Sequence, residues 1–287
     1  MGRLVEGVWK TGWFSANERG EFKRQETTYR DFVRADGSTE FAPEAGRYHL
    51  YVAHACPWAN RTLIMRRLKG LEDAIDVSFV GPRMGEDGWV FDGDHPDQLF
   101  GHSFLRDVYL QASSTYTGRV TVPVLWDKKL ERVVNNESRE IIRMLDHEFS
   151  AITKNDVDYA PKNLRDEIEE TITAIYEPIN NGVYRSGFAT TQSAYEGAVT
   201  DVFQALDHWD AVLATQRYLC GSAITEADIC MFATLIRFDL VYHGHFKCNI
   251  RRISDYPNLS GYTRDLFQTP GFGDTVDFEK VKEHYYW

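Results

Sequence analysis

Hydrophobic and polar positions follow two different periods in the first half of the chain. The segment "GRYHLYVAH" (46–54) alternates as a β-strand does, and "IDVSFVG" (75–81) is typical of a second strand. Between them, residues 57–69 place apolar side chains at helical spacing. The pattern therefore predicts a strand, a helix and a second strand, in that order.

A hairpin and another helix are predicted further along. "RVTVPVLWD" (119–127) and "RVVNN" (132–136) predict the hairpin, and residues 137–149 place their apolar side chains on one helical face. Residues 81–118 contain many Gly, Asp and His residues and scattered aromatics. This segment is long for a loop without structure, which indicates a functional segment or an insertion. The order β-α-β, then β-β-α, is complete near residue 150.

The second half of the chain has a helical period almost throughout. It follows a polar connector at 150–162. Apolar residues then recur at helical spacing in 164–179, 192–214 and 225–242. Within this half, Thr225 and Asp228 have the spacing of a capping box, which predicts a helix start with a purely structural role.

The change in composition near the connector divides the chain. Its 287 residues suit two domains of ordinary size. Residues 1–45 have no sustained period and predict an irregular N-terminal arm. We expect an α/β domain over 46–150 and an all-helical domain over 162–287.

Composition and charge exclude several classes of function. The net charge of −11 would repel nucleic acid. No window reaches the roughly 18 consecutive apolar residues of a membrane span, and the N-terminal residues lack the apolar core of a signal peptide. Cys56, Cys220, Cys230 and Cys248 are too sparse for a secreted disulfide framework. We therefore expect a cytoplasmic protein with reduced thiols and no nucleic-acid or membrane partner.

Cys56 has the sequence context of a reactive cysteine. If the strand ends near Ala55, Cys56 lies at the edge of the next helix and Pro57 takes its first position, where a missing N–H costs nothing. Free N–H groups and the positive end of the helix dipole can lower a cysteine pKa from about 8.5 to between about 3.5 and 7.5. A small buried cysteine is the plain alternative, but this context favours a nucleophile.

The position of a second active-site cysteine is occupied by Ala59. In Cys-x-x-Cys oxidoreductases the second thiol resolves the mixed disulfide with the substrate. A mixed disulfide on Cys56 would therefore need an external thiol. Glutathione is the natural candidate for this second reactant.

Two other segments suit glutathione. In "TVPV", Pro123 removes a donor and, if its bond is cis, turns the strand edge toward the active site, so that Val122 could pair its backbone with the peptide. At Glu137-Ser138 a helix start suits a carboxylate, while the Glu137 side chain suits an ammonium group. The γ-glutamyl end of glutathione carries both groups, although an ordinary helix cap would also explain this pair.

Several motifs together resemble one family. They are "HACPWANRTLI", "DGWVF", "GRVTVPVLWD", "NNESREIIRM", "NNGVYRSGFATTQ", "RFDLVYHGHFKCN" and "EHYYW". From about residue 6 onward the chain resembles the glutathione transferase superfamily, and more narrowly the glutathionyl-hydroquinone reductases of its Xi class. The resemblance implies a thioredoxin-like N-terminal domain, an all-α glutathione-transferase-type C-terminal domain and a homodimer.

The resemblance also implies a reaction and roles for residues. Cys56 would attack the glutathione sulfur of an S-glutathionyl hydroquinone, and a second glutathione, as co-substrate, would resolve the mixed disulfide. Tyr184 would donate or accept the proton, while Tyr242 and Tyr285, or Tyr286 in place of Tyr285, would lower the thiol pKa by hydrogen bonding. The residues matching glutathione-contacting positions are Trp89, Arg119, Val120, Thr121, Val122, Pro123, Glu137 and Ser138.

Other interpretations remain open. A general thioltransferase or dehydroascorbate reductase of the same fold would need Cys56 but not the tyrosines, and a non-catalytic binding protein would need neither. His243, His245 and Cys248 have spacing that could suit zinc, but a solvated loop explains them as well, and we expect no metal site. We expect Cys220 and Cys230 to be buried and inert, and Cys248 to be exposed.

Overall fold

A four-stranded sheet lies at the centre of the first half of the chain in the computed structural model, which describes residues 2–12 and 16–287. The strand order is β4-β3-β6-β7, and β3 is parallel to β4 but antiparallel to β6. The strands are β3 (Tyr48–Val52), β4 (Ile75–Phe79), β6 (Val124–Asp127) and β7 (Arg132–Asn135). All four lie within the segments that the hydrophobic pattern predicts.

The central strand β3 is buried at all five positions instead of alternating. Its neighbours on the 81–118 segment explain this burial, because Tyr51 packs against Phe91 and donates a hydrogen bond to Asp97 Oδ1 at 3.1 Å. The segment expected to be a functional loop or an insertion therefore covers part of the sheet. It also contains a helix that the pattern did not predict, α2 (Leu105–Ala112).

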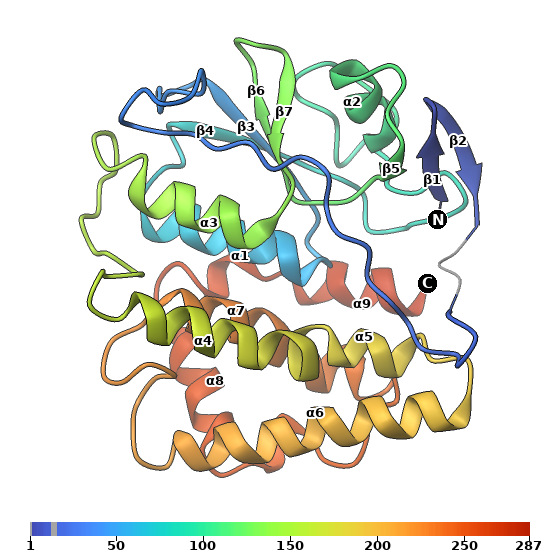
Figure 1. Ribbon diagram of the computed structural model, residues 1–287, viewed down its shortest axis with the longest axis vertical. Helices are drawn as coiled ribbons and strands as arrows, with labels where there is room; N and C mark the ends of the chain where they lie inside the picture. The colour runs from blue at the N-terminus through green and yellow to red at the C-terminus, as the bar shows by residue number, and fades with distance from the viewer. Residues whose placement is uncertain (1, 13–15) are drawn as a thin grey trace.

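Two helices lie between this sheet and the helical second half of the chain (Figure 1). They are α1 (Pro57–Leu68) and α3 (Ser138–His147), and both confirm the helical periods in the sequence. Pro57 occupies the first turn of α1, where its missing N–H leaves no hydrogen bond unmade. The start of α1 follows directly from the end of β3, and this connection positions Cys56.

The N-terminal arm is less irregular than its sequence predicts. β1 (Gly2–Val5) and β2 (Val8–Thr11) form a hairpin, and β5 (Gly118–Arg119) extends it into a sheet of order β2-β1-β5. Glu6 and Gly7 both have positive φ, at 48° and 78°, which is typical of a two-residue hairpin turn. Such short strands carry too little periodicity to be detected from the sequence.

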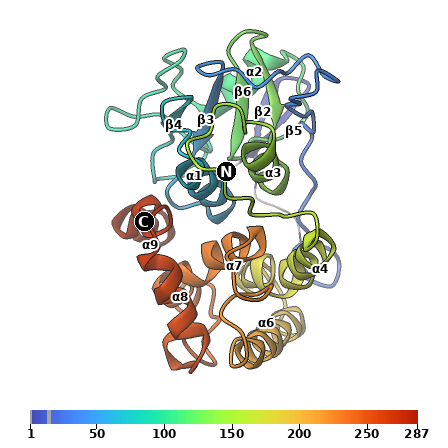
Figure 2. The same cartoon turned by 90° about the vertical axis from the view of Figure 1, so that its left-hand side faces the viewer.

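The second half is helical, as its pattern predicts (Figures 1 and 2). Its α-helices are α4 (Arg165–Ile175), α5 (Gly182–Gly187), α6 (Gln192–Val212), α7 (Glu226–Arg237), α8 (Leu259–Gln268) and α9 (Phe278–Tyr286). Short 3₁₀ turns occur at Ile253–Asp255 and Gly273–Thr275. Among the described residues, no helix combines the length and the apolar character needed to cross a bilayer.

Two π-helical turns interrupt this half, η1 (Tyr176–Asn180) after α4 and η2 (Phe238–Tyr242) after α7. Each replaces the end of a predicted helical segment, because the apolar period does not distinguish a π turn from an α turn. Such turns occur frequently at functional sites. Here they lie next to α5, which carries Tyr184, and at Tyr242 itself.

The two halves are joined by buried charged contacts. Helix α1 packs on α7, and Arg143 of α3 pairs with Glu226 at the start of α7, with Nη2 and Oε2 2.6 Å apart. The Glu226 side chain is fully buried. Buried ion pairs of this kind fix geometry, because removing one partner leaves an uncompensated charge.

The predicted capping box at the start of α7 is confirmed. Asp228 Oδ2 accepts hydrogen bonds from the backbone N–H of Thr225 at 2.8 Å and from its hydroxyl at 2.9 Å. Asp228 Oδ1 accepts from the N–H of Leu219 and from the hydroxyl of Tyr262. This fully buried carboxylate therefore ties the start of α7 to the preceding loop and to α8.

We predict that Asp228→Ala destabilises the protein strongly. The change leaves the donors of Leu219, Thr225 and Tyr262 buried without an acceptor, so the free energy of unfolding should fall by about 3 kcal/mol or more. Chemical denaturation measures this loss. Thr225→Ser, which keeps the hydroxyl, serves as the control and should change stability by less than about 1 kcal/mol. Equal stability of Asp228→Ala and the unchanged protein would contradict the role given to the carboxylate.

Candidate active site

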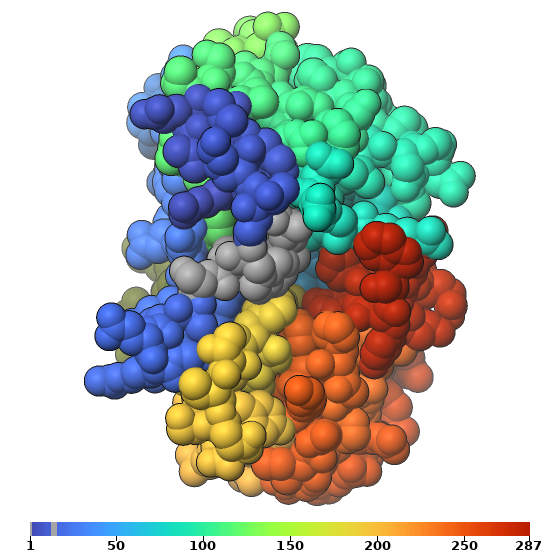
Figure 3. Space-filling model, turned by 90° about the vertical axis from the view of Figure 1, so that its right-hand side faces the viewer, coloured from blue at the N-terminus to red at the C-terminus, as the bar shows by residue number. Residues whose placement is uncertain are grey.

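A cavity of about 440 Å³ lies where the arm, the turn between β3 and α1, and the C-terminal helices meet. Figure 3 shows the face on which the N-terminal hairpin, the segment after β4 and the C-terminal end of the chain come together. Cys56 lines this cavity. So do the other residues predicted from the sequence, with one exception, Tyr242: Trp89, Arg119, Val120, Thr121, Val122, Pro123, Glu137, Ser138, Tyr184 and Tyr285.

Cys56 lies at the N-cap of α1, as its sequence context predicts. Its backbone is extended, with φ −79° and ψ 116°, and the helix begins at the next residue. The thiol donates a hydrogen bond to the carbonyl oxygen of Val122, with Sγ and O 3.5 Å apart. Cys56 is partly exposed and lines the cavity.

The electrostatic environment of Cys56 differs from the sequence-based expectation. Burial raises the pKa of the thiol, because a thiolate loses its hydration there. The N–H groups of Ala59 and Trp58 lower the pKa, as do the charges of Arg237 and Arg24, but burial outweighs them. The helix start does stabilise the thiolate of Cys56, as expected. The expectation that the pKa of Cys56 is lowered overall is wrong, because burial raises it.

Residues 119–123 form the wall of the cavity next to Cys56. The peptide bond between Val122 and Pro123 is cis. This is the isomer that would turn the strand edge toward the active site, as considered from the sequence. Thr121 O accepts a hydrogen bond from the hydroxyl of Tyr109 at 2.8 Å, and Arg119 Nη2 donates to Gln25 O at 2.7 Å. These contacts hold the extended segment in place before β6 begins.

The start of α3 forms another part of the wall. Glu137 is the N-cap, and its Oε1 accepts a hydrogen bond from the backbone N–H of Arg139 at 3.2 Å. Ser138 Oγ lies 3.5 Å from Nη1 of the buried Arg61. Thr27 of the arm donates a hydrogen bond to Glu137 Oε2 at 3.4 Å. The pair is therefore a helix cap and also part of the cavity wall.

The three predicted tyrosines form one hydroxyl cluster. Tyr184 OH lies 2.9 Å from Tyr285 OH and 3.4 Å from Tyr242 OH. Tyr242 is fully buried behind the other two. Burial raises the pKa of Tyr184, and the hydrogen bonds from Tyr242 and Tyr285 lower it. The hydroxyls of Tyr242 and Tyr285 therefore lie next to that of Tyr184 and lower its pKa. Their effect on the pKa of the Cys56 thiol, which the resemblance implied, stays a prediction.

Two residues considered in the sequence lie elsewhere. Tyr286, the alternative to Tyr285, is 56% exposed, and its hydroxyl donates to Leu240 O at 3.1 Å. Cys248 is fully buried, so the expectation of an exposed thiol is wrong. The loop around Cys248 folds inward because the neighbouring Phe246 packs against the rings of Tyr184 and Tyr242. Cys220 and Cys230 are buried, as expected.

Sequence reasoning missed the contribution of the arm. Arg24 lies over the rings of Trp58 and Tyr184, with Cζ 5.0 and 4.8 Å from the ring centroids, and its Nε donates to Asn181 Oδ1 at 2.8 Å. Cation–π contacts of this kind favour a fixed position for the guanidinium. The arm has no hydrophobic period, so no local signal in the sequence identifies Arg24.

His284 and His245 were also missed as lining residues. His284 stacks on Trp89, with ring centroids 5.1 Å apart and planes 14° apart, and its Nδ1 lies 2.7 Å from Pro82 O. Burial lowers the pKa of both histidines, so they favour the neutral form. The contacts of His284 with Pro82 and Trp89 lie about 200 residues apart in the chain, which explains why spacing alone does not reveal it.

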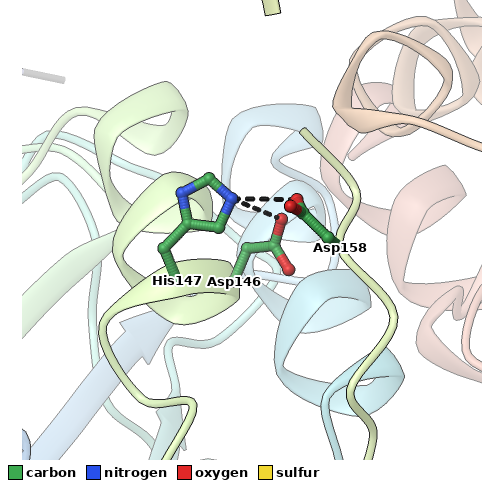
Figure 4. A group of neighbouring side chains, drawn as sticks. All are labelled: Asp146, His147 and Asp158. Atoms are coloured by element: carbon green, nitrogen blue, oxygen red, sulfur yellow. Dashed lines mark hydrogen bonds and ion pairs between the residues drawn. The ribbon is translucent and has the colours of Figure 1, made fainter. Parts of the chain in front are cut away.

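Three side chains outside this cavity lie close enough to share a metal ion, Asp146, His147 and Asp158 (Figure 4). His147 Nε2 is 3.0 Å from Asp158 Oδ1 and 3.4 Å from Asp146 Oδ2. The ammonium group of Lys69 already lies 3.0 Å from Asp146 Oδ1. These contacts tie the connector to the end of α3, and a metal ion is not needed to explain them.

Comparison with known proteins gives consistent results for both halves. The family model for the glutathione S-transferase N-terminal domain matches residues 55–148, and the C-terminal domain model matches residues 192–265. The glutathionyl-hydroquinone reductase YqjG of Escherichia coli K12 is 49% identical, and the match covers 100% of this chain and 90% of YqjG. PcpF of Sphingobium chlorophenolicum, also named a glutathionyl-hydroquinone reductase, is 50% identical, over 100% of this chain and 91% of PcpF.

Solved structures agree with these sequence matches. A Xi class glutathione transferase from Natrialba magadii superposes with a TM-score of 0.94 at 52% identity, over 100% of this chain and 88% of that one. The glutathione-bound structure of YqjG superposes with a TM-score of 0.90 at 48% identity, over 99% of this chain and 90% of that one.

We predict that a thiol reagent labels the native protein once. Cys56 is partly exposed to the cavity, whereas Cys220, Cys230 and Cys248 are buried. Intact-mass analysis after brief iodoacetamide treatment should show one adduct, and peptide mapping should place it on Cys56. The reaction should accelerate on raising the pH above neutrality, because burial raises the thiol pKa. Labelling of two or more cysteines without denaturant would contradict this assignment.

Proposed function

Because this chain belongs to the glutathione transferase family, in the class that includes the glutathionyl-hydroquinone reductases, we propose that it reduces S-glutathionyl hydroquinones to hydroquinones with glutathione as co-substrate. The observation that carries this proposal is the shared cavity of Cys56 and Tyr184. One residue offers a nucleophile and the other a proton donor. Both are needed to remove a sulfur substituent from an aromatic ring.

Glutathione would bind along the wall opposite the tyrosines. The backbone of Val122 can pair with the peptide, as neighbouring strands pair. The hydroxyl and the backbone N–H of Ser138 at the start of α3 suit the γ-glutamyl carboxylate, and Glu137 suits its ammonium group. The buried Arg61 beside Ser138 adds positive charge behind the carboxylate. Trp89 and Arg119 would complete this part of the site.

The first half of the reaction forms a mixed disulfide. The Cys56 thiolate attacks the glutathione sulfur, and the bond between that sulfur and the ring carbon breaks. The electron pair goes to the ring carbon, which takes the proton of the Tyr184 hydroxyl, and the hydroquinone leaves. The hydroxyls of Tyr242 and Tyr285 stabilise the Tyr184 phenolate that remains.

The second half regenerates the enzyme. The thiolate of a second glutathione attacks the glutathione sulfur of the mixed disulfide, forming glutathione disulfide and releasing the Cys56 thiolate. The proton from the second glutathione returns to Tyr184. Ala59 offers no internal thiol for this step, so the reaction depends on external glutathione.

A general thioltransferase or dehydroascorbate reductase is the second candidate. That activity needs Cys56 and the glutathione wall, which are equally available here. The hydroxyl cluster around Tyr184 favours the hydroquinone reaction, since disulfide exchange transfers no proton to carbon. The domain assignments, 46–150 for glutathione and 162–287 for the hydroquinone, follow from the same proposal. A homodimer and a cytoplasmic location also remain predictions.

We predict that Tyr184→Phe separates these two activities. The change removes the proton donor but keeps the ring, so hydroquinone release from an S-glutathionyl hydroquinone should fall by about 100-fold or more. Thiol exchange with a small mixed disulfide of glutathione should fall by less than about threefold. Cys56→Ser should abolish both rates, measured by chromatography of the products. Equal losses in the two reactions for Tyr184→Phe would contradict the role of its hydroxyl.

Ser138→Ala tests the glutathione wall. Loss of a hydrogen bond to the γ-glutamyl carboxylate should raise the KM for glutathione by about tenfold. The kcat should stay within about twofold, because this contact is the same in the ground and transition states. Ser193→Ala, at the exposed start of α6, is the matched control and should leave both constants unchanged. An unchanged KM in Ser138→Ala would place the γ-glutamyl group elsewhere.

A further inference from the structure

Arg237 connects the helical half to the turn that carries Cys56. It is the last residue of α7, and its side chain is fully buried. Its Nη2 donates to His54 O at 2.9 Å, and its Nε donates to Ala55 O at 3.2 Å. Its Nη1 donates to Asn60 Oδ1 at 2.9 Å. One guanidinium therefore holds the chain on both sides of Cys56.

Arg237 and Arg61 are the two buried cations, among the described residues, that form no ion pair with a carboxylate, and Arg237 is the one that contacts the turn at Cys56. Arg47 pairs with Asp127, Lys69 with Asp146 and Arg143 with Glu226. Within residues 2–12 and 16–287, no ion pair joins Arg237 to a carboxylate, and the acceptors given above are neutral oxygens. A buried charge without a counter-charge is costly, even when its donors are satisfied.

The group that can supply the missing negative charge is the Cys56 thiolate. Arg237 of α7 contacts the residues on both sides of Cys56, and the N–H groups of Trp58 and Ala59 belong to the first turn of α1. Arg24 of the arm and Tyr184 of α5 line the same cavity as Cys56. Of the two charged side chains that lower the pKa of Cys56, Arg237 has the larger effect.

We propose that Arg237 is a positioning residue for Cys56, which fixes the turn between β3 and α1 against α7 and provides the counter-charge for the thiolate. This inference rests on the proposed function, in which Cys56 is the nucleophile. It explains why a buried arginine without a carboxylate partner is tolerated at this place. When Cys56 ionises, its thiolate balances the positive charge of Arg237. The cost of burying the guanidinium charge alone therefore favours the thiolate, which is the reactive form of Cys56.

The test compares Arg237→Gln and Arg237→Lys with the unchanged protein. The rate at which iodoacetamide alkylates Cys56 is measured against pH, which reports the thiolate without any substrate. For Arg237→Gln we expect the profile to move toward higher pH, with about tenfold slower alkylation at neutral pH. Arg237→Lys keeps the charge but loses the planar group that donates to four oxygens, those of His54, Ala55, Asn60 and Ala233. Its alkylation profile should therefore stay near that of the unchanged protein, while kcat/KM for hydroquinone release falls by about tenfold.

Arg143→Gln is the matched control. It also removes an arginine that joins the two halves, but the partners of Arg143, Glu169 and Glu226, do not flank Cys56. It should lower the thermal unfolding midpoint and leave the alkylation profile unchanged. A folded Arg237→Gln variant with the alkylation profile of the unchanged protein would overturn the proposal. If the glutamine variant does not fold, an Arg237→Lys variant with undiminished kcat/KM would overturn the positioning role.

The outcomes separate this inference from the proposed function. A shifted alkylation profile in Arg237→Gln supports the counter-charge whatever the substrate is. An unchanged protein that alkylates as expected but releases no hydroquinone refutes the proposed reaction alone.

Discussion

The partial burial of Cys56 in the cavity wall is the constraint that organises this site. A thiolate loses hydration when it is enclosed, and the pKa of Cys56 is raised for that reason. The polar contributions that lower this pKa come from three parts of the chain. The first turn of α1 gives N–H groups, the arm gives Arg24 and α7 gives Arg237. The site therefore depends on correct packing of the two halves, and not on the local turn alone.

Burial also affects Tyr184, the residue that would donate the proton. Tyr184 lies in the cavity, and burial raises its pKa as well, so its phenolate also needs support. Tyr242 at the end of the second π turn and Tyr285 in the C-terminal helix both reach its hydroxyl. A nucleophile and a proton donor thus share one enclosed space, each supported from the helical half. Low local polarity strengthens both sets of interactions.

The sequence predicts those features that depend on neighbouring residues. The strand, the Cys56-Pro57 turn and the helix after it lie within one continuous segment, as do Glu137 and Ser138 at the start of α3. Features that depend on packing were missed or predicted wrongly. The direction of the Cys56 pKa shift and the burial of Cys248 both follow from contacts made across the whole fold. Arg24 could not be found either, since its segment has no period and its partners lie far along the chain.

The measurement that tests this account most directly is a single turnover of the enzyme with one equivalent of an S-glutathionyl hydroquinone and no free glutathione, stopped with acid and examined by intact mass spectrometry. We expect one equivalent of hydroquinone and a protein that has gained one glutathione on Cys56, which a later addition of glutathione removes. Release of hydroquinone without a glutathione adduct on Cys56 would contradict it.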